Sequence, residues 1–593
     1  MCALVIVAGV APHPLRAASL APLPSSVASD DSSRIVALAD ALWARILERQ
    51  VDLAMRYGRP VTQLPTLSLA TAAEDAAFAR TLLARLDSVS PPPIGSEAWS
   101  LAAVVRWGAQ TMVDDLQFFW FQNPISPYAN VLVRGGVQGI FTSFRFATAD
   151  DADRYLDLVG QYPGMIESYI AYLRGQHRRG YVLPTDELDA AIALVQGVRT
   201  DPAHSALAVD SARLVALEPA AASRFRAQLA LEISDRVTPA IDRLLAYLRG
   251  PYAASAPTTV GLSQYAGGTA YYRHLVRTSL TFEMTPEEIH QLGLRNVARV
   301  NAEMDSIRKA LRFRGSRADF HRFLRTDPRF VPKSADEVRA RMLRFASAMQ
   351  PRLARAFEVI PPNPYDVRRL DPALEPGMTF GFYRAPSAAD PMGIYYFNGA
   401  ALDQKTSVWY EGLTYHELNP GHHFHFSLVQ GQMEALHPLR RTFNSTSYTE
   451  GWGEYGALLA GELGGYADPY DRYGRRMMDL FMAVRLVLDT GMNLLGWTRE
   501  RAMAFMRENS LYSEAEIASE TLRYCCDIPA QALGYGMGTM KFQQLRAKAQ
   551  AALGTKFDLR AFHKVILADG PLPFVALEQR VDQYISGAAA GTR

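Results

Sequence analysis

The chain has 593 residues, of which 49% are hydrophobic and 21% are charged. That balance is ordinary for a globular protein with a large core, and it excludes a disordered or collagen-like chain. Basic and acidic residues number 62 and 60 without long blocks of like charge, so we expect neither a nucleic-acid partner nor a polybasic membrane patch. The three cysteines, of which Cys525 and Cys526 are neighbours, make a disulfide framework improbable.

Residues 1–32 predict a signal peptide followed by a flexible leader. Residues 2–11 are an apolar run too short to span a bilayer, and residues 22–32 are rich in Pro, Ser and Asp. The apolar run resembles the h-region of a signal peptide, so we expect a periplasmic or secreted protein. Because no basic residue precedes Arg16, a cytoplasmic protein is the alternative. No later segment reaches about 18 consecutive apolar residues, so we expect no stable membrane insertion.

Helical patterns dominate the rest of the chain, so we expect a mainly α fold. Each helix start is indicated by an N-cap residue, a capping-box glutamate or a proline at the first helical position. The strongest helix signals are Asp150 before a periodic segment, the stretch 219–249, Thr285-Pro286-Glu287-Glu288, Ser334 with Glu337, and Ser513 with Glu516.

The region 363–410 breaks the helical pattern. Gly377–Tyr383 and Gly393–Asn398 are rich in β-branched and aromatic residues and are bounded by turn residues, which predicts a small sheet. An extended peptide could pair with the edge of the Gly393–Asn398 strand, where Tyr396 and Asn398 are candidate substrate-binding residues. The alternative is an ordinary buried hairpin strand.

The segment His416-Glu417-Leu418-Asn419-Pro420-Gly421-His422-His423 resembles an interrupted zinc-hydrolase helix. In an H-E-x-x-H helix, two histidines one turn apart bind zinc and the glutamate acts as general base. Pro420 stands here at the position of the second histidine and cannot donate to the helical ladder. We expect Pro420 and Gly421 to bulge outwards so that His422 becomes the second ligand. His423 would then face the substrate or support a ligand, and the reverse assignment stays open.

A later carboxylate would complete the metal site. Glu450 is our candidate for the third ligand, while Glu454 lies one turn further on the same helix face and could instead orient a ligand. We therefore predict one Zn²⁺ per chain, held by His416, His422 and Glu450, with Glu417 as the base. Manganese or cobalt could occupy the same ligand set.

Several motifs together resemble the bacterial family called domain of unknown function 885. They are the His-Glu-x-x-Pro-Gly-His-His segment, Glu450-Gly451-Trp452, Arg523-Tyr524, Pro529–Tyr535 and Phe557–His563. The resemblance runs from about residue 260 to the C-terminus, and more loosely to residue 33. It departs at Ala530, where the family pattern usually has glycine, and at Gly456-Ala457, where an acidic residue is usual.

This resemblance implies a two-lobed helical fold similar to gluzincin-type metallopeptidases of the angiotensin-converting-enzyme and oligopeptidase kind, with a deep cleft and a small sheet before the metal-binding helix. The lobes would comprise residues 33–260 and 261–593. Tyr535 could donate to the oxyanion of a tetrahedral intermediate, or be a core aromatic. Arg523 could hold a substrate carboxylate, or pair with an internal acid.

The sequence favours a zinc-dependent hydrolase that cleaves amide bonds of short peptides, with Glu417, Tyr535 and His423 as catalytic candidates. Two alternatives stay open. One is a metal-dependent amidase or tailoring enzyme that acts on a non-peptide small molecule, and the other is a binding protein without catalysis. The sequence indicates neither the oligomeric state nor an exopeptidase or endopeptidase mode.

Overall fold

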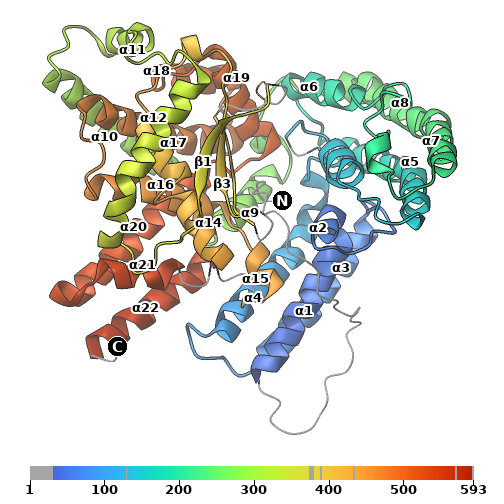
Figure 1. The fold of residues 1–593 in the computed structure, drawn as a ribbon, viewed down its shortest axis with the longest axis horizontal. Helices are drawn as coiled ribbons and strands as arrows, with labels where there is room; N and C mark the ends of the chain where they lie inside the picture. Colours follow the sequence, from blue (N-terminus) through green and yellow to red (C-terminus); the bar gives the residue numbers. More distant parts are fainter. Residues whose placement is uncertain are drawn as a thin grey trace.

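The chain is described from a computed structural model, which covers residues 31–128, 130–372, 375, 380–387, 390–431, 435–567 and 570–590. Most of these residues are helical, which confirms the mainly α prediction. Figure 1 shows the helices α1 to α8 on one side of the molecule and the C-terminal helices on the other. Among the described residues, no helix is long and apolar enough to cross a membrane. The predicted signal peptide lies outside the described residues, and the first helix begins at Asp31, two residues before the expected start of the N-terminal lobe at residue 33.

The N-terminal half is built almost entirely from helices. The segment predicted from Asp150 is confirmed as α5, and the predicted helical stretch 219–249 contains α7 and α8, joined by a π-turn at Ile233–Val237. Pro239 lies just after this turn and cannot donate to the ladder, which accounts for the interruption. The α-helices are α1 Asp31–Arg49, α2 Val51–Arg56, α3 Leu69–Asp87, α4 Glu97–Asp115, α5 Asp150–His177, α6 Thr185–Gln196, α7 Pro219–Glu232 and α8 Thr238–Tyr247.

The predicted helix starts in the middle of the chain are confirmed. Thr285 and Glu288 form a capping box at the start of α10, with each side chain bonded to the other residue's backbone N–H. Ser334 caps α12, although its partner Glu337 accepts from the N–H of Lys333 instead of closing the box. The helices of this region are α9 Gly268–Leu280, α10 Pro286–Ala310, α11 Arg317–Thr326 and α12 Ala335–Met349.

A three-stranded sheet precedes the metal motif, as predicted. Its strands are β1 Tyr365–Arg369, β2 Gly381–Arg384 and β3 Gly393–Phe397, in the order β1-β3-β2. The strand β3 pairs with β1 in parallel and with β2 antiparallel, so both of its edges are occupied. The prediction that a peptide adds to the edge of the Gly393–Asn398 strand is therefore wrong, because that strand is central. Residues 377–379 of the other predicted strand lie outside the described residues.

The C-terminal half surrounds the candidate site. Its helices are α13 Tyr410–Glu417, α14 His422–Gly431, α15 Pro438–Thr442, α16 Thr446–Glu462, α17 Pro469–Asn493, α18 Arg499–Glu508, α19 Glu514–Leu522, α20 Leu533–Leu553, α21 Leu559–Leu567 and α22 Phe574–Ala590. Ser513 closes the predicted capping box at α19. The helices α16 and α20 approach closely because glycines face each other, and a Cβ at Gly538 would lie 1.8 Å from the carbonyl oxygen of Ser447. This packing brings the start of α20 to the start of α16.

Candidate metal centre

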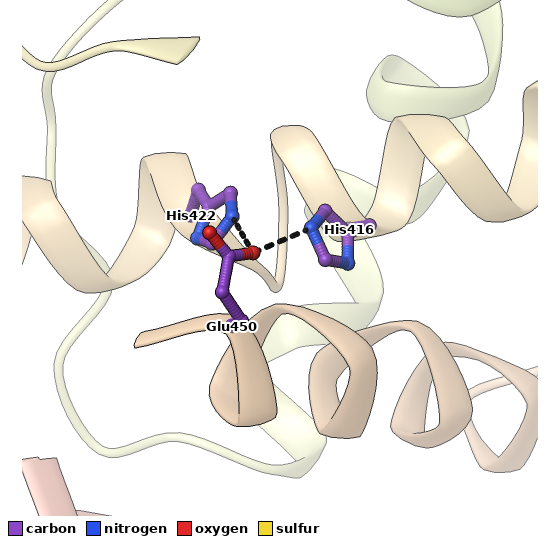
Figure 2. A group of neighbouring side chains, drawn as sticks. All are labelled: His416, His422 and Glu450. Carbon is purple, nitrogen blue, oxygen red and sulfur yellow. Dashed lines mark ion pairs between the residues drawn. The ribbon is translucent and has the colours of Figure 1, made fainter. Parts of the chain in front are cut away.

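Three predicted ligands converge on one point (Figure 2). His416 comes from the last turn of α13, His422 is the first residue of α14, and Glu450 lies near the start of α16. One nitrogen or oxygen atom from each residue lies within 4.8 Å of the other two. Nε2 of His422 is 3.3 Å from a carboxylate oxygen of Glu450, and Nε2 of His416 is 3.5 Å from the same oxygen. The two imidazoles are buried, with 5% and 7% of their residue surface exposed.

The helix between the histidines ends instead of bulging. The predicted single helix with an outward bulge is wrong, because α13 ends at Glu417 and α14 begins at His422. Leu418 leaves the helical region with φ −107° and ψ −116°. Pro420 has no N–H for the carbonyl of His416, so the ladder cannot continue past it. The connection nevertheless places the His422 ring 4.6 Å from the His416 ring, while the role of His422 as a metal ligand stays a prediction.

Two glycines leave the room that this connection needs. A Cβ at Gly421 would lie 1.9 Å from the carbonyl oxygen of His416, so only glycine can pass the end of α13. On α16, a Cβ at Gly453 would lie 2.8 Å from the His416 ring. A Cβ at Gly456 would lie 3.1 Å from the backbone of Gly421, so a larger side chain there would press on the same turn.

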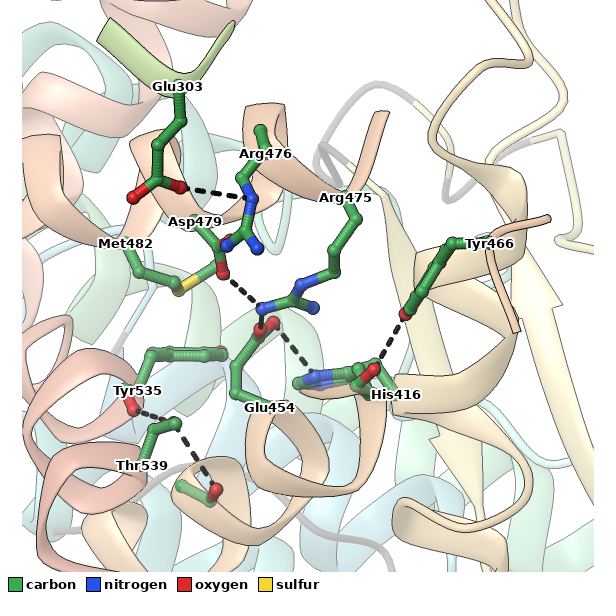
Figure 3. Close-up of polar contacts among 12 residues, drawn as sticks. Glu303, His416, Glu454, Tyr466, Arg475, Arg476, Asp479, Met482, Tyr535 and Thr539 are labelled. Carbon is green, nitrogen blue, oxygen red and sulfur yellow. Dashed lines mark hydrogen bonds and ion pairs between the residues drawn. The ribbon is translucent and has the colours of Figure 1, made fainter. Parts of the chain in front are cut away.

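Glu454 holds His416 from the side opposite Glu450 (Figure 3). One of its carboxylate oxygens lies 3.0 Å from Nδ1 of His416, and the other lies 2.7 Å from the guanidinium of Arg475. Arg475 also pairs with Asp479 at 2.6 Å. This contact favours a proton on Nδ1, so Nε2, which lies on the Glu450 side, is the atom that would bind a metal once His416 is neutral. Glu454 thus contacts His416 from outside the three-residue cluster.

The protonation of the cluster is set by its own members. Burial alone would lower the pKa of His416, but its contacts with Glu450 and Glu454 outweigh burial and raise that pKa to about 10. Burial alone would raise the pKa of Glu450, yet the neighbouring His422 and His416 lower it well below its ordinary value. Metal ligands must be deprotonated, so a bound cation would displace the proton that otherwise holds these groups together.

Glu417, the predicted base, ends α13 beside His416 and has only 8% of its surface exposed. Burial raises the pKa of its carboxyl, and the positive field of His416 and His422 offsets part of that rise. A raised pKa brings a carboxyl closer to the working pH, which favours a role in both accepting and returning a proton. The local environment of Glu417 therefore suits the role predicted for it.

His423 faces away from the cluster. Its Nε2 lies 3.0 Å from the carbonyl oxygen of Asn363, which can only accept, so Nε2 donates and Nδ1 accepts from the Tyr383 hydroxyl at 2.8 Å. Burial lowers the pKa of His423 to about 4 and keeps the ring neutral. Gly393 on β3 makes room, because a Cβ there would lie 2.4 Å from Nδ1 of His423. The geometry places His422, and not His423, with His416 and Glu450, while a catalytic role for His423 stays a prediction.

Tyr535 lies beside the cluster at the start of α20. Its ring stacks on His416 with centroids 6.4 Å apart, and the Arg485 guanidinium lies 4.4 Å from its centre. Arg485 also lies 4.0 Å from the ring centre of Phe481. Burial raises the pKa of Tyr535 to about 12, which keeps the phenol protonated as a hydrogen-bond donor.

Three residues beside the cluster were not predicted from the sequence, namely Arg475, Arg485 and Tyr383. The one available signal was the presence of basic residues within the apolar pattern of α17.

The predicted substrate-binding residues have structural contacts of their own. Arg523 donates to Gln531 at 2.7 Å and lies 3.5 Å from Glu520, so it pairs with an internal acid. Tyr396 stacks on Phe382 across β3 and β2, with centroids 5.2 Å apart. Asn398 donates to the carbonyl of Glu375 at 2.9 Å and so ties down the loop that follows β3. Substrate contact by Arg523, Tyr396 and Asn398 stays a prediction.

Comparison with known proteins places the chain in a family. The profile of the bacterial proteins of unknown function called DUF885 matches residues 52–581, so the chain belongs to that family. A solved structure described as "the putative lipoprotein from Colwellia psychrerythraea" is 25% identical, with a TM-score of 0.81, and the match covers 94% of this chain and 99% of that one. A second, from Shewanella oneidensis and described as "a putative lipoprotein of unknown function", is 20% identical, with a TM-score of 0.73 and coverage of 92% and 99%. No curated protein matches the chain.

Proposed function

We propose that this protein is a zinc-dependent hydrolase that cleaves amide bonds of short peptides. The observation that carries the proposal is the convergence of two imidazole nitrogens and a carboxylate oxygen within 4.8 Å in a buried site. Ligand atoms about 2.0–2.1 Å from a tetrahedral zinc ion lie about 3.3 Å from one another. The separations of 3.3 and 3.5 Å from Glu450 to His422 and His416 fit that requirement. Manganese or cobalt could bind the same donors, but zinc is the metal that two histidines and a glutamate favour.

The roles of the chain's own residues follow from their positions. A bound zinc ion would supply a Lewis acid and an activated water at neutral pH. Glu417 would accept a proton from that water and return it to the leaving amine. Tyr535, which stays protonated, would donate a hydrogen bond to the developing oxyanion. Glu454, fixed by Arg475, would keep the His416 ring in its ligating orientation.

The proposal extends to shape and location. A two-lobed metallopeptidase-like fold is supported by the separation of α1–α8 from the C-terminal helices in Figure 1, with the metal cluster in the C-terminal group. We also propose that the protein works outside the cytoplasm, in the periplasm or beyond. The support for this location is that both solved structures with a similar fold are described as lipoproteins.

A Glu417→Gln variant tests the proposal. It keeps the shape of the side chain but cannot accept the proton, so turnover should fall by about 10²–10⁴-fold while bound zinc stays unchanged. The substrates are short peptides with free and blocked termini, and zinc is measured by elemental analysis. Glu508→Gln, the same change at an exposed position of α18, is the control.

Unchanged turnover in Glu417→Gln would refute the base assignment. If the wild-type protein holds zinc and hydrolyses a non-peptide amide but none of the peptides, the peptide class is wrong while the hydrolase class survives. Zinc-loaded protein that hydrolyses no tested amide would favour a binding role.

A further inference from the structure

The helix that carries His416 is joined to α17 through two carboxyl groups. Glu411, in the first turn of α13, has only 5% of its surface exposed. Asp471, in the first turn of α17, shares a side-chain hydrogen bond with Glu411. A carboxylate can only accept, so two carboxyl groups share a hydrogen bond only when one of them is protonated. The contact between these two helices therefore contains one proton.

The surroundings of Glu411 favour it as the acceptor in this contact. Its Oε1 atom accepts from the hydroxyl of Tyr415 at 2.7 Å and from the backbone N–H of Tyr466 at 2.9 Å. Hydrogen bonds donated to a carboxyl stabilise its charged form. These two donors therefore favour a charged Glu411 and leave the shared proton to Asp471.

The cations on the elements around the two carboxyls donate to other groups. They are Arg341 of α12, which donates to Ser407, Arg352, which donates to the carbonyl of Gly464, Arg472 of α17, which donates to the carbonyls of Tyr466 and Ala467, and Arg475 of α17, which pairs with Glu454 and Asp479. The remaining acid nearby, Asp468, caps α17 by accepting from the N–H of Tyr470 at 2.7 Å. Within the described part of the chain, Glu411 and Asp471 thus meet without a salt bridge of their own.

The shared proton is held up to neutral pH. Burial and the negative charge of Glu411 raise the pKa of Asp471 from its ordinary value of 3.8 to about 7, and Arg341 offsets part of that rise. Between these two values the folded protein holds a proton that the unfolded chain does not hold. The free energy of unfolding therefore falls as the pH rises across this range, and the contact is lost as the pH passes about 7.

We propose that the hydrogen bond between Asp471 and Glu411 is a pH-sensitive switch on the helix of His416. When Asp471 carries the proton, it donates to Glu411 and holds the first turn of α13 against α17. When that proton passes to solvent, the two carboxylates repel each other and the start of α13 loosens. Glu411 also accepts from Tyr415, the residue before His416, so the change reaches the other end of the helix. The proposal depends neither on zinc nor on hydrolysis.

Hydrogen exchange of the backbone amides of residues 413–416 in the full chain tests the switch. Asp471→Asn keeps a donor for Glu411 at every pH, because an amide does not lose its N–H groups. The two proteins should exchange alike at about pH 6, and the wild type should exchange at least about ten-fold faster at about pH 8.5. Comparison at equal pH cancels the intrinsic pH dependence of exchange. Asp336→Asn, at an exposed position in the first turn of α12, is the matched control and should behave as the wild type does.

Three outcomes would overturn the proposal. Equal exchange in the wild type and Asp471→Asn at about pH 8.5 would show that no contact is lost there. A difference of the same size at both pH values would give Asp471 a structural role without a switch. The third outcome needs no variant, because infrared spectra of the wild type should lose the carbonyl band of a protonated carboxylic acid between about pH 6 and about pH 8.5, and a spectrum without that loss refutes the shared proton. In folded Asp471→Asn, verified by its melting temperature, the loss should be smaller by one group.

Discussion

Two buried clusters of ionisable side chains lie beside the helix α17, which contributes Arg485 to one and, through Arg475, supports Glu454 next to the other. The two clusters differ in how their atoms meet. In the arginine cluster, made of Arg485, Glu520, Arg523 and Tyr524, donors face acceptors. Arg485 donates to the Tyr524 hydroxyl at 3.0 Å and to Glu520 at 3.2 Å. In the metal centre, by contrast, the Nε2 atoms of two histidines and a carboxylate oxygen face one another. Lone pairs converge there, and only a cation or a proton can hold them together.

We interpret this difference as the one between a structural charge cluster and a candidate metal site. Guanidiniums pair with carboxylates and hydroxyls, so the arginine cluster contains its own counterions. On the outer side of the candidate metal centre, Arg475 pairs with both Glu454 and Asp479. The residue Arg475 thus serves the metal centre, while Arg485, about 15 Å further along the same helix, serves the structural cluster.

Removing a charge from the arginine cluster should affect stability and not metal content. Arg485→Met leaves Glu520, with 1% of its side chain exposed, short of a counterion. We expect the free energy of unfolding to fall by about 3–5 kcal/mol. Thermal unfolding measures the loss, and elemental analysis should still find one zinc per chain in the folded variant. Zinc loss without a change in stability would contradict the division between the clusters.

Weakening the contact between Glu454 and His416 should lower zinc affinity more than it lowers stability. Glu454→Gln removes the charge that orients His416, so zinc affinity should fall by about 10–100-fold in competition with a chelator. Glu462→Gln, an exposed position at the end of the same helix, is the matched control and should bind zinc as the wild type does. Equal zinc affinity in the two variants would show that Glu454 does not position the ligand.

The smallest effect is expected at Ala530, beside the arginine cluster. This residue has a φ of +68°, a region that favours glycine. Its N–H donates to both carboxylate oxygens of Asp489, at 3.1 and 3.0 Å, which holds the backbone in that conformation. Ala530→Gly should raise the free energy of unfolding by about 0.5–1 kcal/mol and leave zinc binding unchanged. A lower melting temperature would contradict this account.

Much of the fold could be predicted from local signals in the sequence. The capping residues Thr285 and Ser513 mark helix starts because their side chains satisfy backbone groups within three residues. The convergence of His416, His422 and Glu450 was also accessible, since metal-ligating residue types at recognisable spacing are rare by chance.

What the sequence did not reveal depends on packing between distant segments. Pro420 shows that a helix is interrupted, but whether the chain bulges or starts a second helix depends on Gly456 and the other residues that face the turn. The central position of β3 follows from pairing with β1, whose charged residues Asp366, Arg368 and Arg369 give no strand signal. The role of Arg475 depends on Glu454, 21 residues earlier in the chain. Such contacts lie beyond local periodicity.

The measurement that tests the central claim most directly is the metal content of purified protein with single histidine and glutamate replacements. We predict one zinc ion per chain in the wild type and in His423→Ala, and loss of zinc in His416→Ala, His422→Ala and Glu450→Ala. The adjacent histidines serve as each other's control, because both are buried in α14 but only His422 faces Glu450. Folded wild-type protein without metal after incubation with zinc, or zinc retained in His422→Ala and lost in His423→Ala, would contradict the account.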